Sequence, residues 1–385
     1  MARGHALQAQ RITESMHSNT HPSARAWLAD LPLWTILAPV IAGIVLGAAG
    51  FGLGPSGIFV GIIALALAGS VFAAVHHAEV VAHRVGEPYG TLVLALAVTL
   101  IEVALIVSLM IAGGTEAAAL ARDTLFAAVM IILNGIIGLC LLVGGLRHRE
   151  QTFSLDGVSA ALVALAAIVI LALVFPNYTV TTPGPYYSPS QLMLIAVVSL
   201  AIYGAFVFAQ TIGHRGIFLE DEPATESQHA PPPSNAVAAL SAILLLACLT
   251  AVVVLAKKLA PSLEAAVLSV GAPNAVVGVI IAAIVLLPEG LAALRAARAN
   301  RLQTSLNLAL GSALASIGLT IPAVSVLSLY MHTDLVLGID TKSTVLLILS
   351  LFITTVALHT GRTIVLHGIV LLVIFVVYLF TTVVP

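Results

Sequence analysis

Residues 90–112 read GTLVLALAVTLIEVALIVSLMIA, an apolar run in which a single carboxylate, Glu102, stands near the middle. A helix needs about 20 predominantly apolar residues to cross the hydrocarbon core of a bilayer. The run therefore predicts a membrane-spanning helix that carries an acid at the depth of the lipid chains.

The composition of the whole chain agrees with that prediction. Of 385 residues, 60% are hydrophobic and 8% are charged, whereas a soluble domain carries roughly 25% charged residues. A chain with so little charge cannot cover the surface of a soluble domain, so we expect it to sit in lipid. The net charge of -2 gives no basic face for phosphates, which argues against a nucleic-acid partner.

Further apolar runs of similar length occur along the sequence. With the first run they give eleven candidate spans, at about 34–50, 57–76, 90–112, 124–146, 157–175, 190–213, 236–256, 264–287, 303–330, 343–359 and 363–383. The sequence therefore predicts an all-α polytopic membrane protein with about eleven transmembrane helices.

A polar, acidic and proline-rich stretch interrupts these runs and divides the chain. The predicted parts are an N-terminal tail (1–33), an extra first helix (34–56), a first repeat (57–213), the linker (214–235) and a second repeat (236–385). Each repeat holds five spans, an odd number, so the two repeats must cross the membrane in opposite directions. Inverted repeats of this kind are typical of secondary transporters.

The positive charges predict the orientation. Eleven of the 15 Lys and Arg residues fall in segments on the side of the N-terminus, and only Arg122, Lys257, Lys258 and Lys342 fall in segments on the other side. Cytoplasmic loops are enriched in Lys and Arg. We therefore expect the tail and the linker to be cytoplasmic and Pro385 to face outward.

Two carboxylates are placed where water is scarce. Glu102 lies mid-span. Glu289 lies at the end of the apolar run that closes the predicted span 264–287, inside a helical stretch expected to continue to Ala299, so that each acid belongs to the second span of its repeat. A charge at the bilayer centre costs several kcal/mol. One such acid could be a protonated group that bonds to a neighbouring helix, but a pair at matching places favours a function. Glu116 and Glu264, by contrast, fall in predicted outer segments.

Neutral oxygen-bearing side chains accompany the two acids. Thr99 stands three residues before Glu102, Asn134 lies mid-span, and Ser312 opens a run of small residues at 311–318. Taken singly, such side chains commonly make hydrogen bonds between helices. Together with two carboxylates they predict an oxygen-only shell, which suits hard cations such as Ca²⁺ or Na⁺.

Several segments resemble one family, the calcium/proton exchangers. AEVVAHRVGEPYG at 78–90, leading into Thr99 and Glu102, is similar to that family's first alpha-repeat. GGLRHREQTF at 144–153 is similar to a further family segment. The stretches from Pro288 to Arg301 and from Gly311 to Pro322 resemble the second alpha-repeat.

The resemblance implies an antiporter of the bacterial inner membrane that exports Ca²⁺ in exchange for protons. It implies no cofactor beyond the transported ions, and a bilayer as the protein's surroundings. Some members of this branch exchange Na⁺ or K⁺ instead. The family also uses a Glu at the place of Glu79, so Glu79 with nearby His77 is a candidate proton route; polar residues at the membrane interface are the alternative.

Departures from the family pattern bear on the choice of ion. Both carboxylates are kept, but Ala97 and Val98 stand where the family has Gly-Asn before the first acid, and 285–288 reads VLLP before the second. An amide ligand is therefore lost, which leaves Ca²⁺ and Na⁺ or K⁺ open as substrates.

The sequence also bears on other classes of membrane protein. An intramembrane metalloprotease would need His-Glu-x-x-His and a serine hydrolase Gly-x-Ser-x-Gly, and the chain contains neither motif. We therefore do not expect an enzyme. A passive channel stays an alternative, and it would differ by conducting ions without proton coupling.

Overall fold

The computed structural model describes residues 31–50, 57–86, 89–113, 119–218 and 232–384. In this part of the chain, nine helical stretches are long and apolar enough to cross a membrane. Two further helices, α3 and α5, contain shorter apolar segments at Leu33–Ala49 and Leu96–Ser108. The all-α polytopic fold with eleven helical crossings is therefore confirmed.

The elements follow one another in two sets of five crossings after α3. Helix α3 (Leu33–Gly50) precedes the first half. The first half consists of α4 (Gly57–Val85), α5 (Tyr89–Gly113), a continuous stretch of α6 (Leu120–Met130), η2 (Ile131–Ile136) and α7 (Ile137–His148), then β1 (Glu150–Thr152), α8 (Leu155–Val169) with η3 (Ile170–Val174) and η4 (Phe175–Tyr178), and α9 (Pro189–Phe208) with η5 (Ala209–Gly213). The second half consists of η6 (Arg215–Phe218), α10 (Asn235–Ser269), α11 (Ala275–Arg298), α12 (Leu302–Met331), α13 (Thr341–Leu358), β2 (Arg362–Ile364) and α14 (Val365–Val383).

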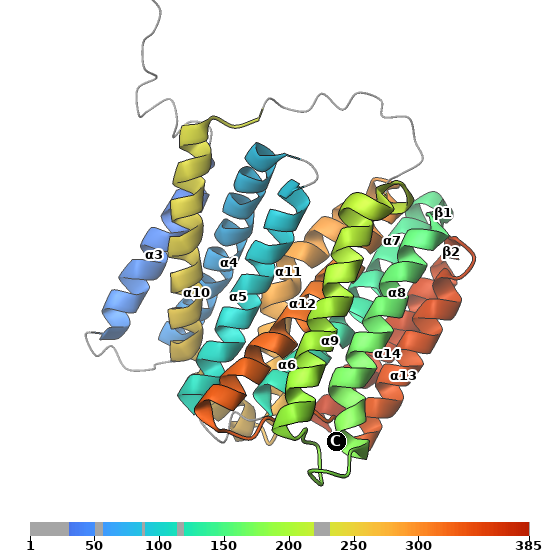
Figure 1. Ribbon diagram of the computed structural model, residues 1–385. Helices are drawn as coiled ribbons and strands as arrows, with labels where there is room; N and C mark the ends of the chain where they lie inside the picture. The colour runs from blue at the N-terminus through green and yellow to red at the C-terminus, as the bar shows by residue number, and fades with distance from the viewer. Residues whose placement is uncertain (1–30, 51–56, 87–88, 114–118, 219–231, 385) are drawn as a thin grey trace, which may run out of the picture.

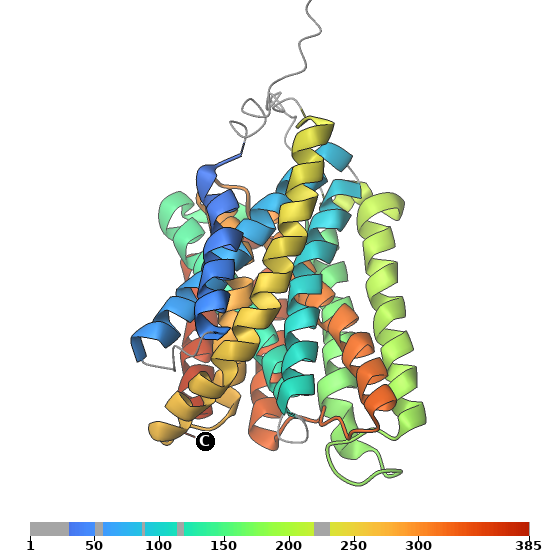
Figure 2. The same cartoon turned by 90° about the vertical axis from the view of Figure 1, so that its left-hand side faces the viewer.

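Buried apolar side chains form two main clusters. One joins α3, α4 and α10, and the other joins α6 to α9 with α12 to α14. Figure 1 shows α3, α4 and α10 on the left and α8, α13 and α14 on the right. In Figure 2 the side that carries α3, α4 and α10 is turned toward the viewer.

Helices α5 and α11 lie at the seam between these clusters. On α5, Leu105 belongs to the first cluster and Ile106 to the second; on α11, Ile281 and Ala282 divide in the same way. Each of the two helices therefore packs against the first cluster with one face and against the second cluster with another. The two predicted carboxylates are carried by these seam helices.

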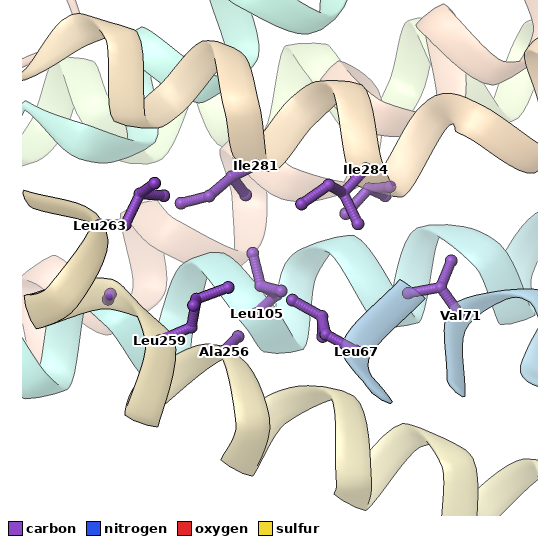
Figure 3. Close-up of a pocket in the computed structure, with 10 residues that line it drawn as sticks. Leu67, Val71, Leu105, Ala256, Leu259, Leu263, Ile281 and Ile284 are labelled. Atoms are coloured by element: carbon purple, nitrogen blue, oxygen red, sulfur yellow. The ribbon is translucent and has the colours of Figure 1, made fainter. Parts of the chain in front are cut away.

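An apolar pocket opens on this seam. It lies among α4, α5, α10 and α11, and Figure 3 shows its lining side chains converging from these helices. The lining residues are Leu67, Val71, Leu105, Ala256, Leu259, Ala260, Leu263, Ile281, Ile284 and Val285. Apolar cavities stay dry and offer no ligand to an ion. This pocket is therefore not the cation site.

A short two-stranded ribbon joins the halves at one end of the molecule, which we call the ribbon end. Strands β1 and β2 pair antiparallel, with Gln151 opposite Thr363. Both residues are buried. The ribbon lies at the ends of α7 and α13, the end from which α10 also begins (Figure 1).

Two predicted helix boundaries are wrong. Helix α10 continues to Ser269 through Lys257, Lys258 and Pro261, where the sequence predicted a loop after 256. Helix α11 begins at Ala275 rather than at 264, and it ends at Arg298, next to the expected Ala299. The apolar count locates the part of a helix that lies in lipid, whereas a helix can continue beyond it with exposed charged side chains. Glu264, predicted in an outer segment, is exposed on the last turns of α10.

Some predicted features fall outside the described residues. These are residues 1–30 of the N-terminal tail, residues 51–56 after the extra first helix, Glu116, and residues 219–231 of the acidic linker.

Candidate functional site

Helix α5 buries Glu102 near its middle. The carboxylate is 3% exposed and accepts a hydrogen bond from the hydroxyl of Ser316 on α12. Thr99, three residues earlier and on the same side of the helix, is also buried. The predicted neighbourhood of Thr99 and Glu102 is therefore present, and it meets the second half of the chain through α12.

Helix α11 places Glu289 in its interior, inside the helical stretch that the sequence predicted to continue to Ala299. The side chain is 8% exposed, and neither Oε1 nor Oε2 has a hydrogen-bond partner among the described residues. The adjacent Gly290 lets α11 approach η2 closely, because a Cβ at this position would lie 3.2 Å from the side chain of Ile136. A buried carboxyl group without a partner is costly, so Glu289 needs a proton or a cation.

The charges show which acids are near one another. Glu102 and Glu79 are the two carboxylates whose charges act on Glu289. Glu79, on the exposed side of α4, also interacts electrostatically with His76 and with Arg295 of α11. Because Arg295 follows Glu289 by six residues on α11, Glu79 lies on the ribbon-end side of Glu289. These groups form one electrostatic set at the seam.

Ser316, rather than Ser312, is the serine that meets a carboxylate. Ser312 is half-buried one turn earlier on the same face of α12. The sequence predicted Ser312, the first of the two serines in the run of small residues at 311–318. Only the relative depth of α5 and α12, which a sequence pattern does not give, decides between serines four positions apart.

Asn134 is turned toward another helix. It lies in the π-helical turn η2, is fully buried, and its Nδ2 donates to Ser350 Oγ on α13 over 2.8 Å. Its Oδ1 has no partner in the described part of the chain. The hydrogen bonds of Asn134 thus tie η2 to α13, which is the interhelical role that the sequence left open, and they do not join it to Glu102.

His77 and Glu79 point to different surroundings. His77 is fully buried, and its Nε2 lies 3.2 Å from the backbone oxygen of Thr35 on α3. Glu79 is exposed and interacts with Arg295 instead. The structure does not bring these two side chains together, and a proton route through either of them stays a prediction.

The buried acids do not form a closed metal centre. Among the described residues, no group of three or more His, Cys, Asp or Glu side chains could hold a metal ion. A transported cation at Glu102 and Glu289 would need further oxygens from hydroxyl groups, the backbone or water.

Comparison with known proteins places this architecture. The family model described as "Sodium/calcium exchanger protein" matches residues 53–212 and 240–384. The putative ionic transporter y4hA of Sinorhizobium fredii is 48% identical over 364 residues, which are 93% of this chain and 98% of that protein. The sodium-potassium/proton antiporter ChaA of Escherichia coli is 39% identical over 315 residues, which are 81% of this chain and 85% of that protein.

Solved structures share the fold. The structure of native YfkE has a TM-score of 0.69 at 18% identity and covers 91% of this chain and 100% of that chain. The H⁺/Ca²⁺ exchanger CAX has a TM-score of 0.67 at 14% identity, with coverage of 90% and 87%. The family match over both halves, together with the fold, leads to one conclusion: the chain belongs to the sodium/calcium exchanger protein family, a family of multi-pass membrane transporters of cations.

Proposed function

We propose that this protein is a secondary antiporter that exports Ca²⁺ in exchange for protons, with Glu102 and Glu289 as the groups that bind both. The observation that carries the proposal is the placement of these acids. Each is buried in the second helix of its half, and the charge of Glu102 acts on Glu289. Two carboxylates can neutralise one divalent cation or bind two protons.

Charge balance explains the coupling. Outside water, two neighbouring carboxylates do not both stay ionised without a positive charge between them. The site is therefore filled either by the cation or by protons, so entry of protons drives out the cation. Access to the site from the two sides of the membrane would alternate as α3, α4 and α10 move against the cluster formed by α6 to α9 and α12 to α14, in the manner of inverted-repeat transporters.

The proposed orientation puts the ribbon end in the cytoplasm. The Arg residues near this end include Arg84, Arg147, Arg295 and Arg362, and cytoplasmic ends of membrane helices are enriched in such charges. The N-terminus would then be cytoplasmic and Pro385 outward, in a bacterial inner membrane. Glu79 would be the acid through which cytoplasmic protons or cations approach Glu289.

Exchange of Na⁺ or K⁺ for protons is the second candidate function. One observation favours it: the relative that is 39% identical is named a sodium-potassium/proton antiporter. The same two acids would serve both functions.

Flux in inverted membrane vesicles tests the proposal. Vesicles would be energised to an acidic interior, and uptake of Ca²⁺, Na⁺ and K⁺ would be followed with dissipation of the pH gradient between pH 6 and 9. We expect cation-dependent loss of the gradient with Ca²⁺ as the preferred ion. If Na⁺ or K⁺ gave the larger response, that ion would take the place of Ca²⁺ as the proposed substrate. Cation flux that leaves the pH gradient intact would refute antiport.

A further inference from the structure

The segment 144–153 has no role in the proposed site, yet its contacts cross between the two halves. It begins at the end of α7 and passes into β1 through Arg149, which has a left-handed φ of 67°. The strand then pairs with β2 of the second half. Two residues after this turn, the side chain of Gln151 is buried.

Gln151 fastens the end of α11. The side chain is 2% exposed, and its Nε2 donates to the backbone oxygen of Ala297 and to Oδ1 of Asn300, both over 3.0 Å. Its amide lies against Gly144 of α7, where a Cβ would come within 1.8 Å of Oε1. Only glycine leaves room for this side chain, so α7 and the end of α11 are joined through one buried amide.

A second glutamine makes the reverse connection. Gln303, in the first turn of α12, is 3% exposed, and its Oε1 accepts from the backbone N–H of Ser154 over 2.7 Å. Its Nε2 donates to Oδ1 of Asn307 over 3.1 Å. Gln151 thus reaches from the first half to the second, and Gln303 from the second half to the first. We call Gln151, Gln303 and their partners the glutamine clasp.

The clasp acts on the helix that carries Glu289. Ala297 is eight residues after Glu289, about 12 Å along the axis of one helix. Ala293 and Ala297 are fully buried and pack with Cys140 of α7, so this end of α11 fits closely against α7. Because a helix transmits displacement along its axis, loosening the end of α11 moves Glu289.

Glu289 depends on this anchoring more than Glu102 does. Glu102 is held by the hydroxyl of Ser316, whereas both oxygens of Glu289 lack a partner in the described structure. The position of Glu289 is therefore set by its backbone. We propose that Gln151 is a positioning residue for exchange, which fixes α11 through Ala297 and Asn300 and so sets the distance between Glu289 and Glu102; this rests on the proposed function.

The test measures cation dependence in variants of the clasp. Gln151→Leu removes both hydrogen bonds, while Asn300→Gly removes one acceptor and suits the left-handed φ of 61° at this position. In vesicles, with the cation that the wild type exchanges best, we expect the apparent KM to rise about fivefold or more in Gln151→Leu and less in Asn300→Gly. The double variant should resemble Gln151→Leu, because the Asn300 contact is already lost.

Glu150→Gln is the matched control. Glu150 is the neighbour of Gln151 on β1, and its exposed ion pair with Arg362, 3.5 Å long, lies outside the clasp. We expect this variant to keep the wild-type KM. The amount of folded protein in the membrane, measured by fluorescence-detected size exclusion, separates folding from positioning.

The outcomes distinguish the two proposals. If Gln151→Leu and Asn300→Gly lower only the amount of folded protein or the maximal rate, and the KM and pH profile match the wild type, the positioning role is refuted. If the wild type itself shows no proton-coupled exchange of any tested cation, the proposed function fails first.

Discussion

Glu102 and Glu289 stand on corresponding helices of the two halves, but their surroundings differ. Glu102 accepts a hydrogen bond from Ser316, a residue of the other half. Glu289 is buried to a similar degree, and neither of its oxygens has a partner among the described residues. In addition, Glu289 is the acid on which two other carboxylates, Glu102 and Glu79, act.

This difference indicates a division of labour. An ionised carboxylate that is buried without a partner loses its hydration and gains nothing in return, so Glu289 is stable only with a proton or a cation beside it. Glu102 keeps a donor in either state. If the two acids bind the exchanged ions as proposed, Glu289 is the group whose occupancy changes and Glu102 is the group that is held in place.

The largest expected effect comes from neutralising the acids. Glu289→Gln and Glu102→Gln each keep the shape but remove one charge and one titratable proton. Either change leaves a divalent cation half-neutralised, so we expect exchange to fall by about 100-fold or more. The measurement is the initial rate of cation-dependent loss of the pH gradient in vesicles with matched protein content.

The different surroundings of the two acids bear on the thermal stability of these two variants. A neutral amide is less costly in lipid than a charge, and Glu289 has no hydrogen bond to lose, so Glu289→Gln should be at least as thermally stable as the wild type. Glu102→Gln keeps a carbonyl for the Ser316 hydroxyl. Proton-coupled Ca²⁺ and Na⁺ fluxes that persist in Glu102→Gln would rule out a shared site.

The next largest effect is expected for Ser316→Ala, which removes the hydrogen bond that distinguishes Glu102 from Glu289. A hydrogen bond to a charged group contributes about 1.5–3 kcal/mol, so the apparent cation affinity should fall roughly tenfold. Ser312→Ala is the control, because Ser312 lies one turn away and half-buried. Equal losses in both variants would show that α12 as a whole, and not the Ser316 hydroxyl, supports Glu102.

The sequence was sufficient for the fold because lipid simplifies the pattern. Long apolar runs predicted the eleven helical crossings. An acid inside or at the end of such a run stands out, which made Glu102 and Glu289 the candidate ion-binding residues; that role stays a prediction. Which side chains contact one another across neighbouring helices could not be predicted from the sequence. Ser316 and Ser312 have the same local pattern, and only the depth of α12 against α5 separates them.

Helix ends and side-chain directions show the same limit. The span predicted at 236–256 ends before Lys257, but the helix continues to Ser269, because exposed charges are tolerated beyond the lipid. His77 and Glu79 are two residues apart and so point to different sides of α4. The sequence predicted Asn134 as an ion ligand. Its hydrogen bond to Ser350 depends on the packing of α13 against η2, which the sequence pattern does not give.

A smaller effect is expected at Glu79, the acid that links Glu289 to the ribbon end. Glu79 is exposed and acts through space, so its loss removes an interaction of about 1 kcal/mol and should slow exchange by about three- to fivefold. The rate should fall without a change in apparent cation affinity, and the pH dependence should flatten. Vesicle rates between pH 6 and 9 measure both. A loss as large as that of Glu289→Gln would instead place Glu79 in the binding site.

The smallest effect is expected for Glu264→Gln, which makes the same chemical change as Glu289→Gln on a helix of the same half. Helix α10 has 35 residues, roughly 52 Å of helix against a hydrocarbon core of about 30 Å. Its last turns, with the exposed Glu264, therefore extend beyond the lipid chains, where the carboxylate is hydrated and interacts weakly. Surface substitutions of this kind change stability by no more than about 0.5 kcal/mol, so exchange should stay within about twofold of the wild type. The two variants would be assayed side by side at equal protein content. If Glu264→Gln lost as much exchange as Glu289→Gln, burial would not be what makes an acid functional in this chain.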